Sequence, residues 1–345
     1  MDKIEDRFNK ELKAAKSIIM DRDRLIQEGC YPNKFGFPIT LQFEVTSKCN
    51  LACKHCYNRS GIKNNNDLMT GEGWVNLSRK IVNNGGIMHA IISGGEPLLL
   101  GKYLWQMMDI LQEDNTMFDL ITNGFLFNTD TLRQIQKYRF NRVQVSIDSY
   151  RSDYHDEFRG VKGSWEKAVH AAYSISLSGI PLRVASTVKP REIDHVEDFI
   201  KMAINLGASE IIIGDVMPSG RAYDNDDIFL SRDERNKLYE EVELYEKKYK
   251  KEIQVIISGM SRAHMEYARE RTLEGAVIRP DGSIRLDCQM PFVIGNVLTD
   301  DLRKIWKEKW NCWQHPLVTK YIESCDPISG RSNLLENYND KDVCI

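Results

Sequence analysis

Residues 40–57 read TLQFEVTSKCNLACKHCY and join a short apolar run to a loop with three cysteines. The run ends at Val45 and alternates with the two-residue period of a β-strand. Cys49, Cys53 and Cys56 follow it in the pattern C-x3-C-x2-C. Thiolates this close in sequence are typical ligands of an iron–sulfur cluster or of zinc. Three ligands on one loop leave a fourth coordination position open, which indicates chemistry.

The same spacing has a structural alternative. A zinc ion completed by His55 or by a remote cysteine would also use these thiols, although structural zinc sites usually take their ligands as two separated pairs. The chain has 345 residues, 8 cysteines, 47 Lys+Arg and 50 Asp+Glu. The near balance of charge speaks against a charge-driven binder of nucleic acid or membranes. With no signal-like N-terminus and no apolar run of about 20 residues, we expect a cytoplasmic protein whose cysteines bind metal.

Outward from this loop, strand-like and helix-like segments alternate. Strands are predicted at Thr40 to Val45, Met88 to Ser93, Phe118 to Thr122, Arg142 to Ile147, Leu182 to Val188 and Glu210 to Val216. Helices are predicted at Gly73 to Asn84, Tyr103 to Glu113, Asp130 to Tyr138, Trp165 to Ser178 and Val196 to Leu206. This order predicts an α/β fold with six parallel strands, either an open sheet or a barrel. In both, the chemistry sits at the carboxyl ends of the strands.

Polar and glycine residues stand at several of these strand ends. Ser93 is followed by Gly94, Gly95, Glu96 and Pro97. The two glycines permit close approach of the backbone to a ligand, and Glu96 is an acceptor suited to an ammonium group, although Gly-Gly is more often a plain turn.

The third and fourth strands end in polar residues as well. Asn123 follows the third strand and is either part of a simple turn or part of a site. Ser146 lies on the polar face of the fourth strand, which alternates with an apolar face.

At the cysteine loop and at Gly94 to Pro97, the chain resembles the radical S-adenosylmethionine (radical SAM) enzymes. The resemblance implies a partial (β/α)6 barrel and a [4Fe-4S] cluster on Cys49, Cys53 and Cys56. The amino and carboxylate groups of SAM would chelate the fourth iron, with Gly94, Gly95, Glu96 and Pro97 binding the methionine amino group. Tyr57 is the aromatic residue that the family has next to the last cysteine.

Further site residues are implied by resemblance to the peptide- and protein-modifying members. Ser146 is implied to contact the ribose or carboxylate of SAM, and Asn123 to lie in the same cofactor site. Arg159, in HDEFRG, is implied to hold the methionine carboxylate, the alternative being a surface ion pair. Met217, after the sixth strand, is implied to border the adenine, the alternative being core packing.

The C-terminal sequence resembles the extension called SPASM, or its shorter relative twitch. Asp281-Gly282, Cys288, Gly295-Asn296 and Trp306 carry this likeness, but the dense cysteine run of the full motif is missing. Four cysteines remain as candidate ligands of one auxiliary cluster: Cys288, Cys312, Cys325 and Cys344. Two alternatives stay open, namely ordinary buried cysteines and, for Cys312, Cys325 or Cys344, donation of a hydrogen atom to a substrate radical.

We expect three regions: an N-terminal helical segment (1–37), the radical SAM core (38–225) and the α+β extension (226–345). The expected function is reductive cleavage of SAM to a 5′-deoxyadenosyl radical, which abstracts hydrogen to modify a ribosomally made peptide by cross-link, thioether or epimer. The expected partners are the peptide, a separate leader-recognition protein and a reductant such as flavodoxin or ferredoxin. The separate recognition protein is expected because residues 1–37 are too few for an independent domain. The alternatives are a small-molecule radical SAM enzyme, an iron–sulfur electron carrier and a zinc-stabilised binding protein.

Overall fold

The computed structural model describes residues 9–10, 13, 17, 20–61, 63, 67–258, 261–270, 272–326, 332, 334 and 342–345. Residues 20–27 are helical. The expected N-terminal helical segment (1–37) is described only in part, and the apolar residues that recur along it at helical spacing lie outside the described residues: Ile4, Phe8, Leu12, Ala15 and Ile19.

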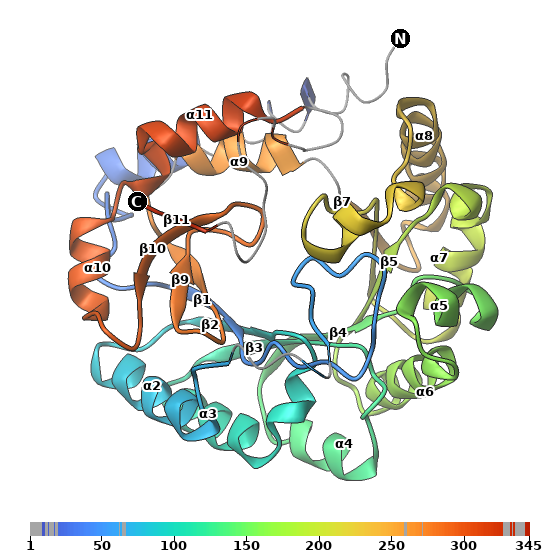
Figure 1. The fold of residues 1–345 in the computed structure, drawn as a ribbon, viewed down its shortest axis with the longest axis horizontal. Coiled ribbons are helices and arrows are strands. Elements are labelled where there is room, and N and C mark those ends of the chain that lie inside the picture. The colour runs from blue at the N-terminus through green and yellow to red at the C-terminus, as the bar shows by residue number, and fades with distance from the viewer. Residues whose placement is uncertain are drawn as a thin grey trace.

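One curved sheet of eleven strands organises the molecule, in the order β11-β10-β9-β8-β1-β2-β3-β4-β5-β6-β7 (Figure 1). Strands β1 to β7 are mutually parallel. They are β1 (Thr40–Glu44), β2 (His89–Ser93), β3 (Met117–Thr122), β4 (Phe140–Ser146), β5 (Leu182–Thr187), β6 (Glu210–Gly214) and β7 (Gln254–Ser258). All of their carboxyl ends therefore meet at one edge, where a ligand site is expected.

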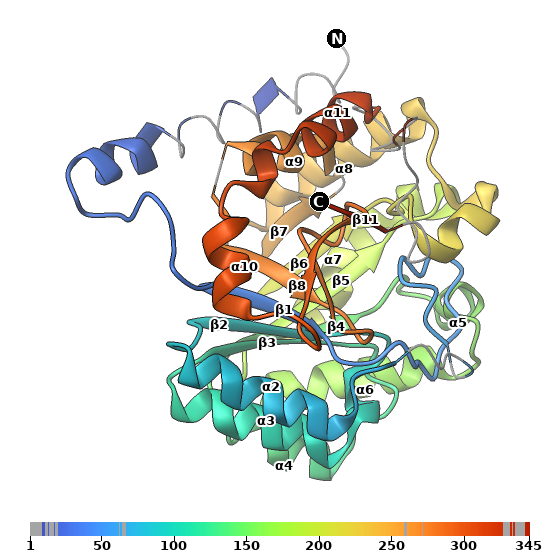
Figure 2. The same cartoon turned by 60° about the vertical axis from the view of Figure 1, so that its left-hand side comes forward.

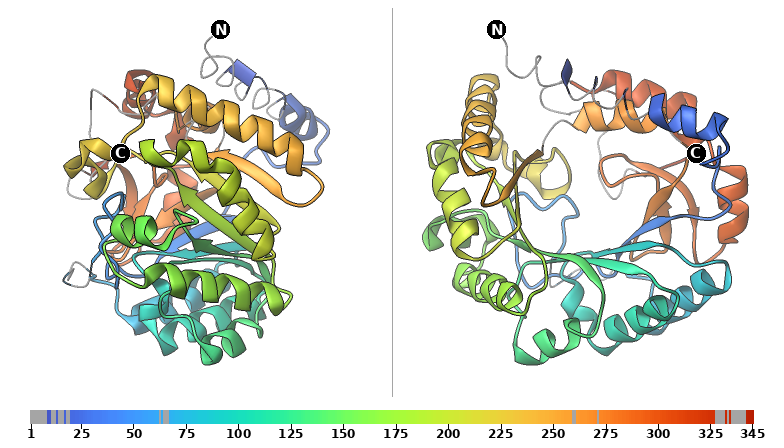
Figure 3. Two further views of the ribbon diagram at one scale, coloured as in Figure 1. Left: turned by 90° about the vertical axis from the view of Figure 1, so that its right-hand side faces the viewer. Right: turned by 180° about the vertical axis from the view of Figure 1, so that it is seen from behind.

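Helices cover the outer face of this sheet, as the opposite views in Figures 1 and 3 both show. They are α2 (Gly71–Asn83), α3 (Lys102–Glu113), α4 (Thr129–Ile135), α5 (Ser152–Arg159), α6 (Ser164–Leu177), α7 (Val196–Asn205) and α8 (Arg232–Tyr249). In β4, Val143 and Val145 are fully buried toward the helices, while Gln144 and Ser146 face the inside of the curve. The period-two pattern thus builds the core on one face and leaves the other face polar.

The six predicted strands and five predicted helices are all present, with ends shifted by a few residues. The parallel sheet continues beyond them, because α8 leads into β7, which pairs with β6. α8 is rich in charged residues, but one face of it packs inward: Leu238 and Val242 are buried in the core.

The C-terminal region extends the same sheet on the other side of β1 (Figure 2). β8 (Gly275–Ile278) pairs in parallel with β1, and β9 (Ser283–Arg285), β10 (Phe292–Asn296) and β11 (Val343–Cys344) follow outward. The helices of this region are α9 (Ser261–Arg269), α10 (Leu302–Glu308), the 3-10 helix η5 (Cys312–Gln314) and α11 (Pro316–Ser324). The division at residues 37 and 225 stays a prediction, since the sheet runs across the second boundary. Within the described residues, no helix combines the length and apolar composition needed to cross a bilayer.

Candidate active site

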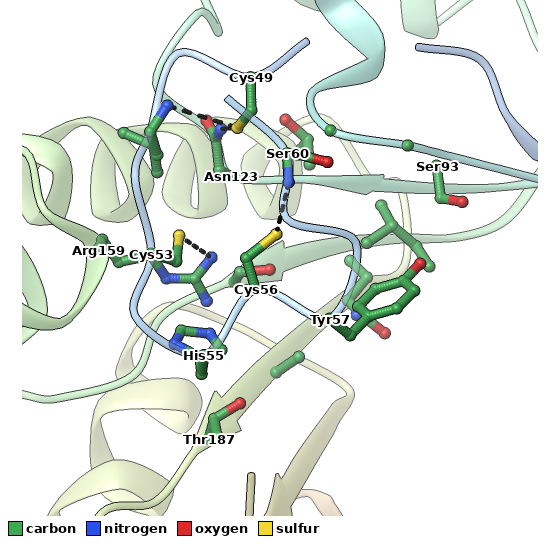
Figure 4. A pocket seen from close by; sticks show the side chains of 18 residues that line it. Cys49, Cys53, His55, Cys56, Tyr57, Ser60, Ser93, Asn123, Arg159 and Thr187 are labelled. Atoms are coloured by element: carbon green, nitrogen blue, oxygen red, sulfur yellow. Dashed lines mark hydrogen bonds between the residues drawn. The ribbon is translucent and has the colours of Figure 1, made fainter. Parts of the chain in front are cut away.

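A cavity of about 290 Å³ lies at the carboxyl ends of the central strands. The cysteine loop after β1 covers one side of it, and β2 to β5 form the other (Figure 4). Its lining residues are Cys49, Leu51, Cys53, His55, Cys56, Tyr57, Ser60, Ser93, Gly94, Gly95, Ile121, Thr122, Asn123, Gln144, Ser146, Arg159, Ala185 and Thr187. Of the predicted cofactor residues, six besides the three cysteines line this one space, from Tyr57 in the cysteine loop to Arg159 at the end of α5.

The turn after β2 is hydrogen-bonded to the start of the cysteine loop. The amide of Gly95 donates to the Thr46 carbonyl at 2.7 Å, and the amide of Glu96 donates to the Lys48 carbonyl at 3.0 Å. A Cβ on Gly95 would stand 2.1 Å from the Lys48 carbonyl oxygen. Glycine is required here because the loop backbone approaches this closely. The sequence predicted close approach to a ligand, and the structure adds the loop itself as a partner.

The end of α5 holds the middle of the loop. The amides of Ala52 and Lys54 donate to the carbonyls of Arg159 and Phe158 at 3.1 and 3.0 Å. These bonds place the Arg159 side chain beside Cys53.

Arg221 holds the far side of the loop, from the 3-10 helix η3 (Gly220–Asp224) after β6. Its guanidinium donates to the Cys53 carbonyl at 2.7 Å and to the Ser60 carbonyl at 2.6 Å, and its amide donates to the Cys56 carbonyl at 2.8 Å. Gly220 permits this contact, because a Cβ there would be 2.2 Å from the Tyr57 carbonyl oxygen. No local sequence pattern predicted that Gly220 and Arg221 position the cysteine loop.

Each of the three sulfurs accepts a hydrogen bond from nitrogen (Figure 4). Cys49 Sγ accepts from the Leu51 amide at 3.4 Å and from Asn123 Nδ2 at 3.7 Å. Cys56 Sγ accepts from the Ser60 amide at 3.3 Å, and Cys53 Sγ from Arg159 Nη1 at 3.9 Å. Such donors stabilise negative charge on sulfur, which is the state in which cysteine binds iron.

The protein alone does not ionise Cys49 or Cys53. Burial raises the pKa of Cys49 to about 12 and that of Cys53 to about 11. Their protons are therefore released when metal binds. Among the described residues, no three His, Cys, Asp or Glu side chains are spaced to hold a single metal ion. A cluster binds each thiolate through a different iron, so its ligands stand farther apart than those of one ion.

The cavity also presents polar groups that suit a polar ligand. The buried Ser60 Oγ and His55 Nδ1 line it and have no hydrogen-bond partner among the described residues. A buried polar atom without a partner costs stability unless a ligand or water satisfies it. Together with the three thiols, these atoms fit a cluster and a polar organic cofactor in the same space.

Glu96 is fully buried and its carboxylate is engaged by the end of β3. It accepts hydrogen bonds from Thr122 Oγ1 at 2.8 Å, the Asn123 amide at 2.9 Å and the Leu98 amide at 3.2 Å. Burial raises the pKa of the Glu96 carboxyl to about 7, although these hydrogen bonds act to lower it. Glu96 does not itself line the cavity, and neither does Pro97, which opens the 3-10 helix η1 (Pro97–Leu100). In the structure Glu96 therefore positions Asn123 at the cavity wall.

Arg159 forms a buried ion pair with Asp148. Its Nε donates to Asp148 Oδ2 at 2.6 Å, and the Thr187 amide donates to Asp148 Oδ1 at 3.0 Å. Burial would raise the pKa of Asp148, but Arg159 outweighs it and holds the pKa below its usual range. The alternative of a surface ion pair is therefore wrong: both side chains are buried.

Of the three remaining predicted residues, Tyr57 and Ser146 line the cavity and Met217 does not. Tyr57 donates from its hydroxyl to Glu44 Oε1 at 2.9 Å. Ser146 lines the cavity from the end of β4. Met217 is partly exposed and is not among the lining residues.

The four C-terminal cysteines lie on separate elements. Cys312 and Cys325 are buried within the main hydrophobic core, which suits packing. Cys344 is exposed on β11, and Cys288 lies between β9 and β10. None of the four lines the cavity.

Residues 43–203 match the family described as the radical SAM superfamily, so the chain contains a radical SAM domain. Members use a [4Fe-4S] cluster and SAM, and the thiols and cavity fit both. This domain and the α/β fold were both predicted from the sequence and are confirmed.

Two relatives bear on function. AlbA of Bacillus subtilis (strain 168), an antilisterial bacteriocin subtilosin biosynthesis protein, is 27% identical over 298 residues, 86% of this chain and 64% of AlbA. An AdoMet-dependent heme synthase of Nitratidesulfovibrio vulgaris is 23% identical over 343 residues, 87% of this chain and 89% of the relative. The chain spans between 54% and 64% of the length of AlbA and of two other maturation proteins that it matches.

Among solved structures, Streptococcus suis SuiB bound to precursor peptide SuiA has a TM-score of 0.64 at 16% identity, over 86% of this chain and 68% of SuiB. At that identity the likeness establishes the shared fold.

Proposed function

We propose that this protein is a radical SAM enzyme that cleaves SAM reductively to a 5′-deoxyadenosyl radical and abstracts hydrogen from a peptide. The observation that carries the proposal is one loop with three thiols, each with a nitrogen donor, opening into the cavity formed by the strand ends. A [4Fe-4S] cluster held by Cys49, Cys53 and Cys56 would supply the electron for reductive cleavage of SAM.

The chain's own residues hold the parts in place. Cys49, Cys53 and Cys56 bind the cluster. Asn123 and Arg159 donate toward the Cys49 and Cys53 sulfurs and so favour the reduced, more negative cluster.

The strand ends would hold SAM itself. The backbone of Gly94 and Gly95 offers polar groups to the methionine end, and Ser146 offers its hydroxyl. Arg159 provides the positive charge for the methionine carboxylate. Tyr57 would border the cofactor from the cysteine loop, and Met217, which lies outside the cavity lining, would approach the adenine only when SAM is bound.

The proposal is tested by anaerobic reconstitution, reduction with dithionite and quantification of 5′-deoxyadenosine formed from SAM. The wild type is expected to form it and Cys53→Ala to form none. Cys30→Ala is the matched control, because Cys30 is exposed and outside the loop. Formation of 5′-deoxyadenosine by Cys53→Ala would refute the assignment.

A peptide substrate is supported by the bacteriocin relative AlbA and by the precursor peptide in the SuiB structure. The test uses short peptides encoded beside the gene, deuterated at their α- and β-carbons. Transfer of deuterium into 5′-deoxyadenosine identifies the substrate. A leader-recognition protein and a flavodoxin or ferredoxin in the cytoplasm are the partners we propose for this reaction.

A small-molecule substrate is the second candidate, because the heme synthase is matched over nearly its whole length. A tetrapyrrole would then stimulate 5′-deoxyadenosine formation where the peptides do not.

One auxiliary cluster on Cys288, Cys312, Cys325 and Cys344 stays a separate proposal. Iron analysis of the variant with Cys49, Cys53 and Cys56 all changed to Ala tests it. About four irons per chain would remain if the auxiliary cluster exists, and background iron would refute it.

A further inference from the structure

Two buried arginines lie on the side of β1 where the C-terminal strands pair, Arg279 at the carboxyl edge of the sheet and Arg285 on antiparallel β9, opposite Val277. Arg279 directly follows β8, whose Ile278 pairs with Phe43 of β1, so Arg279 lies next to Glu44. Arg285 ends β9. Arg279 is 6% exposed and Arg285 is 2% exposed. Two guanidinium groups buried this deeply need anionic partners.

Their principal anionic partner is Asp342, from a segment distant in sequence. Asp342 Oδ2 accepts from Arg279 Nη1 at 2.5 Å, and Oδ1 accepts from Arg285 Nε at 3.1 Å and from Arg285 Nη2. The match is incomplete, because the buried Arg279 Nε has no hydrogen-bond partner among the described residues and lies 3.8 Å from Glu44 Oε2.

The residues after Asp342 bind as a short added strand. The Val343 amide donates to the Pro291 carbonyl at 2.7 Å, and the Ile345 amide donates to the Val293 carbonyl at 3.0 Å. This strand, β11, has two residues and pairs only with β10 among the described residues. An extended segment held by main-chain bonds and one charged anchor is a recognised way for proteins to bind peptides.

The arginine pair is linked to the cysteine loop. Glu44 accepts from the Tyr57 hydroxyl at 2.9 Å with its other oxygen, and Tyr57 lines the cavity. A peptide anchored at Arg279 and Arg285 would therefore lie next to the reactive space.

We propose that Arg279, Arg285 and the edge of β10 form a docking site for an extended acidic segment of the peptide substrate, and that residues 342–345 occupy it in the free protein. The inference rests on the proposed peptide substrate. An incoming Asp or Glu replaces Asp342 between the two guanidinium groups, and its backbone takes the two bonds of β11. A bidentate, charge-assisted site of this kind discriminates a carboxylate from an amide.

The test measures binding of a fluorescein-labelled probe, Asp-Val-Ser-Ile amide, by anisotropy, with Asn-Val-Ser-Ile amide as its matched control. In the wild type, residues 342–345 compete with the probe for the site at an effective concentration in the millimolar range, so the probe binds weakly. Asp342→Asn is expected to bind the Asp probe at least tenfold more tightly than the wild type and tenfold more tightly than the Asn probe. Glu252→Gln, at an exposed carboxylate, should behave as the wild type. Equal binding of the two probes, or no gain in Asp342→Asn, overturns the inference.

A second measurement does not depend on the folding of that variant. In the wild type, millimolar Asp probe is expected to raise deuterium uptake by residues 342–345, and the Asn probe to leave it unchanged. Unchanged uptake with both probes overturns the docking site. Neither measurement involves SAM cleavage, so a negative result here does not contradict the proposed radical chemistry. That chemistry would be refuted separately, by a wild-type protein that does not cleave SAM.

Discussion

Gly95→Ala tests whether the turn after β2 sets the position of the cysteine loop. The new Cβ would stand 2.1 Å from the Lys48 carbonyl oxygen, where ordinary contacts begin at 3.4 Å. The loop must therefore move by about 1.3 Å, whereas metal ligands tolerate errors of roughly 0.2 Å. The move also breaks the bond from the Glu96 amide to Lys48.

We expect Gly95→Ala to bind about four fewer irons per chain than the wild type, which is the content of the cluster on Cys49, Cys53 and Cys56. Its 5′-deoxyadenosine formation should fall by roughly 100-fold, the usual effect of a misplacement near 1 Å. The fold should survive, because overpacking of this kind costs about 1–3 kcal/mol. Iron analysis, SAM cleavage and thermal unfolding measure the three effects.

Gly101→Ala is the matched control, a few residues along the same chain segment. Gly101 has a φ of +59° and nothing within 4 Å of its added Cβ. This variant should lose about 1–3 kcal/mol of stability through backbone strain and keep its iron. The reasoning is refuted if Gly95→Ala keeps wild-type iron and cleaves SAM within about threefold of the wild type, well short of the loss expected from misplacement.

Three further variants test other parts of the site. Arg221→Met removes two hydrogen bonds to the cysteine loop, so a chelator should strip its iron at least tenfold faster than that of the wild type; equal rates would contradict this role. Asp148→Asn leaves Arg159 buried without its anion and should cost about 3–5 kcal/mol in urea unfolding at neutral pH. Because the pKa of Asp148 is lowered in the fold, this stabilisation is present above the unfolded pKa of about 3.9 and is lost as pH falls below that value. A difference in unfolding free energy between the wild type and Asp148→Asn that does not change with pH would refute the pairing. Asn123→Ala removes a donor to Cys49 and should make the cluster's reduction potential more negative, and an unchanged potential in an EPR titration would exclude the bond.

The elements that sequence alone predicted are those with local signals. Strands such as Thr40–Glu44 alternate with a period of two, and the cysteine spacing and the Gly-Gly turn are short motifs. The polar face of β4 was also predicted from alternation, and Ser146 does face the cavity.

The parts that could not be predicted depend on contacts between distant segments. Arg221 lies 168 residues from Cys53, whose carbonyl it binds, and no local pattern reports that bond. Glu96 looked like a free acceptor, but its carboxylate meets the end of β3, which only the assembled sheet brings near. The pairing of β8 with β1 was missed for the same reason, because register between remote strands leaves no trace in either strand's sequence.

The most direct test of the account is EPR spectroscopy of the dithionite-reduced protein with and without SAM. A cluster held by Cys49, Cys53 and Cys56 has one iron free, so SAM should bind it and change the spectrum. Cys53→Ala should give no EPR signal that changes when SAM is added. A wild-type spectrum that SAM leaves unchanged, or the same SAM-responsive signal in Cys53→Ala, would contradict the account.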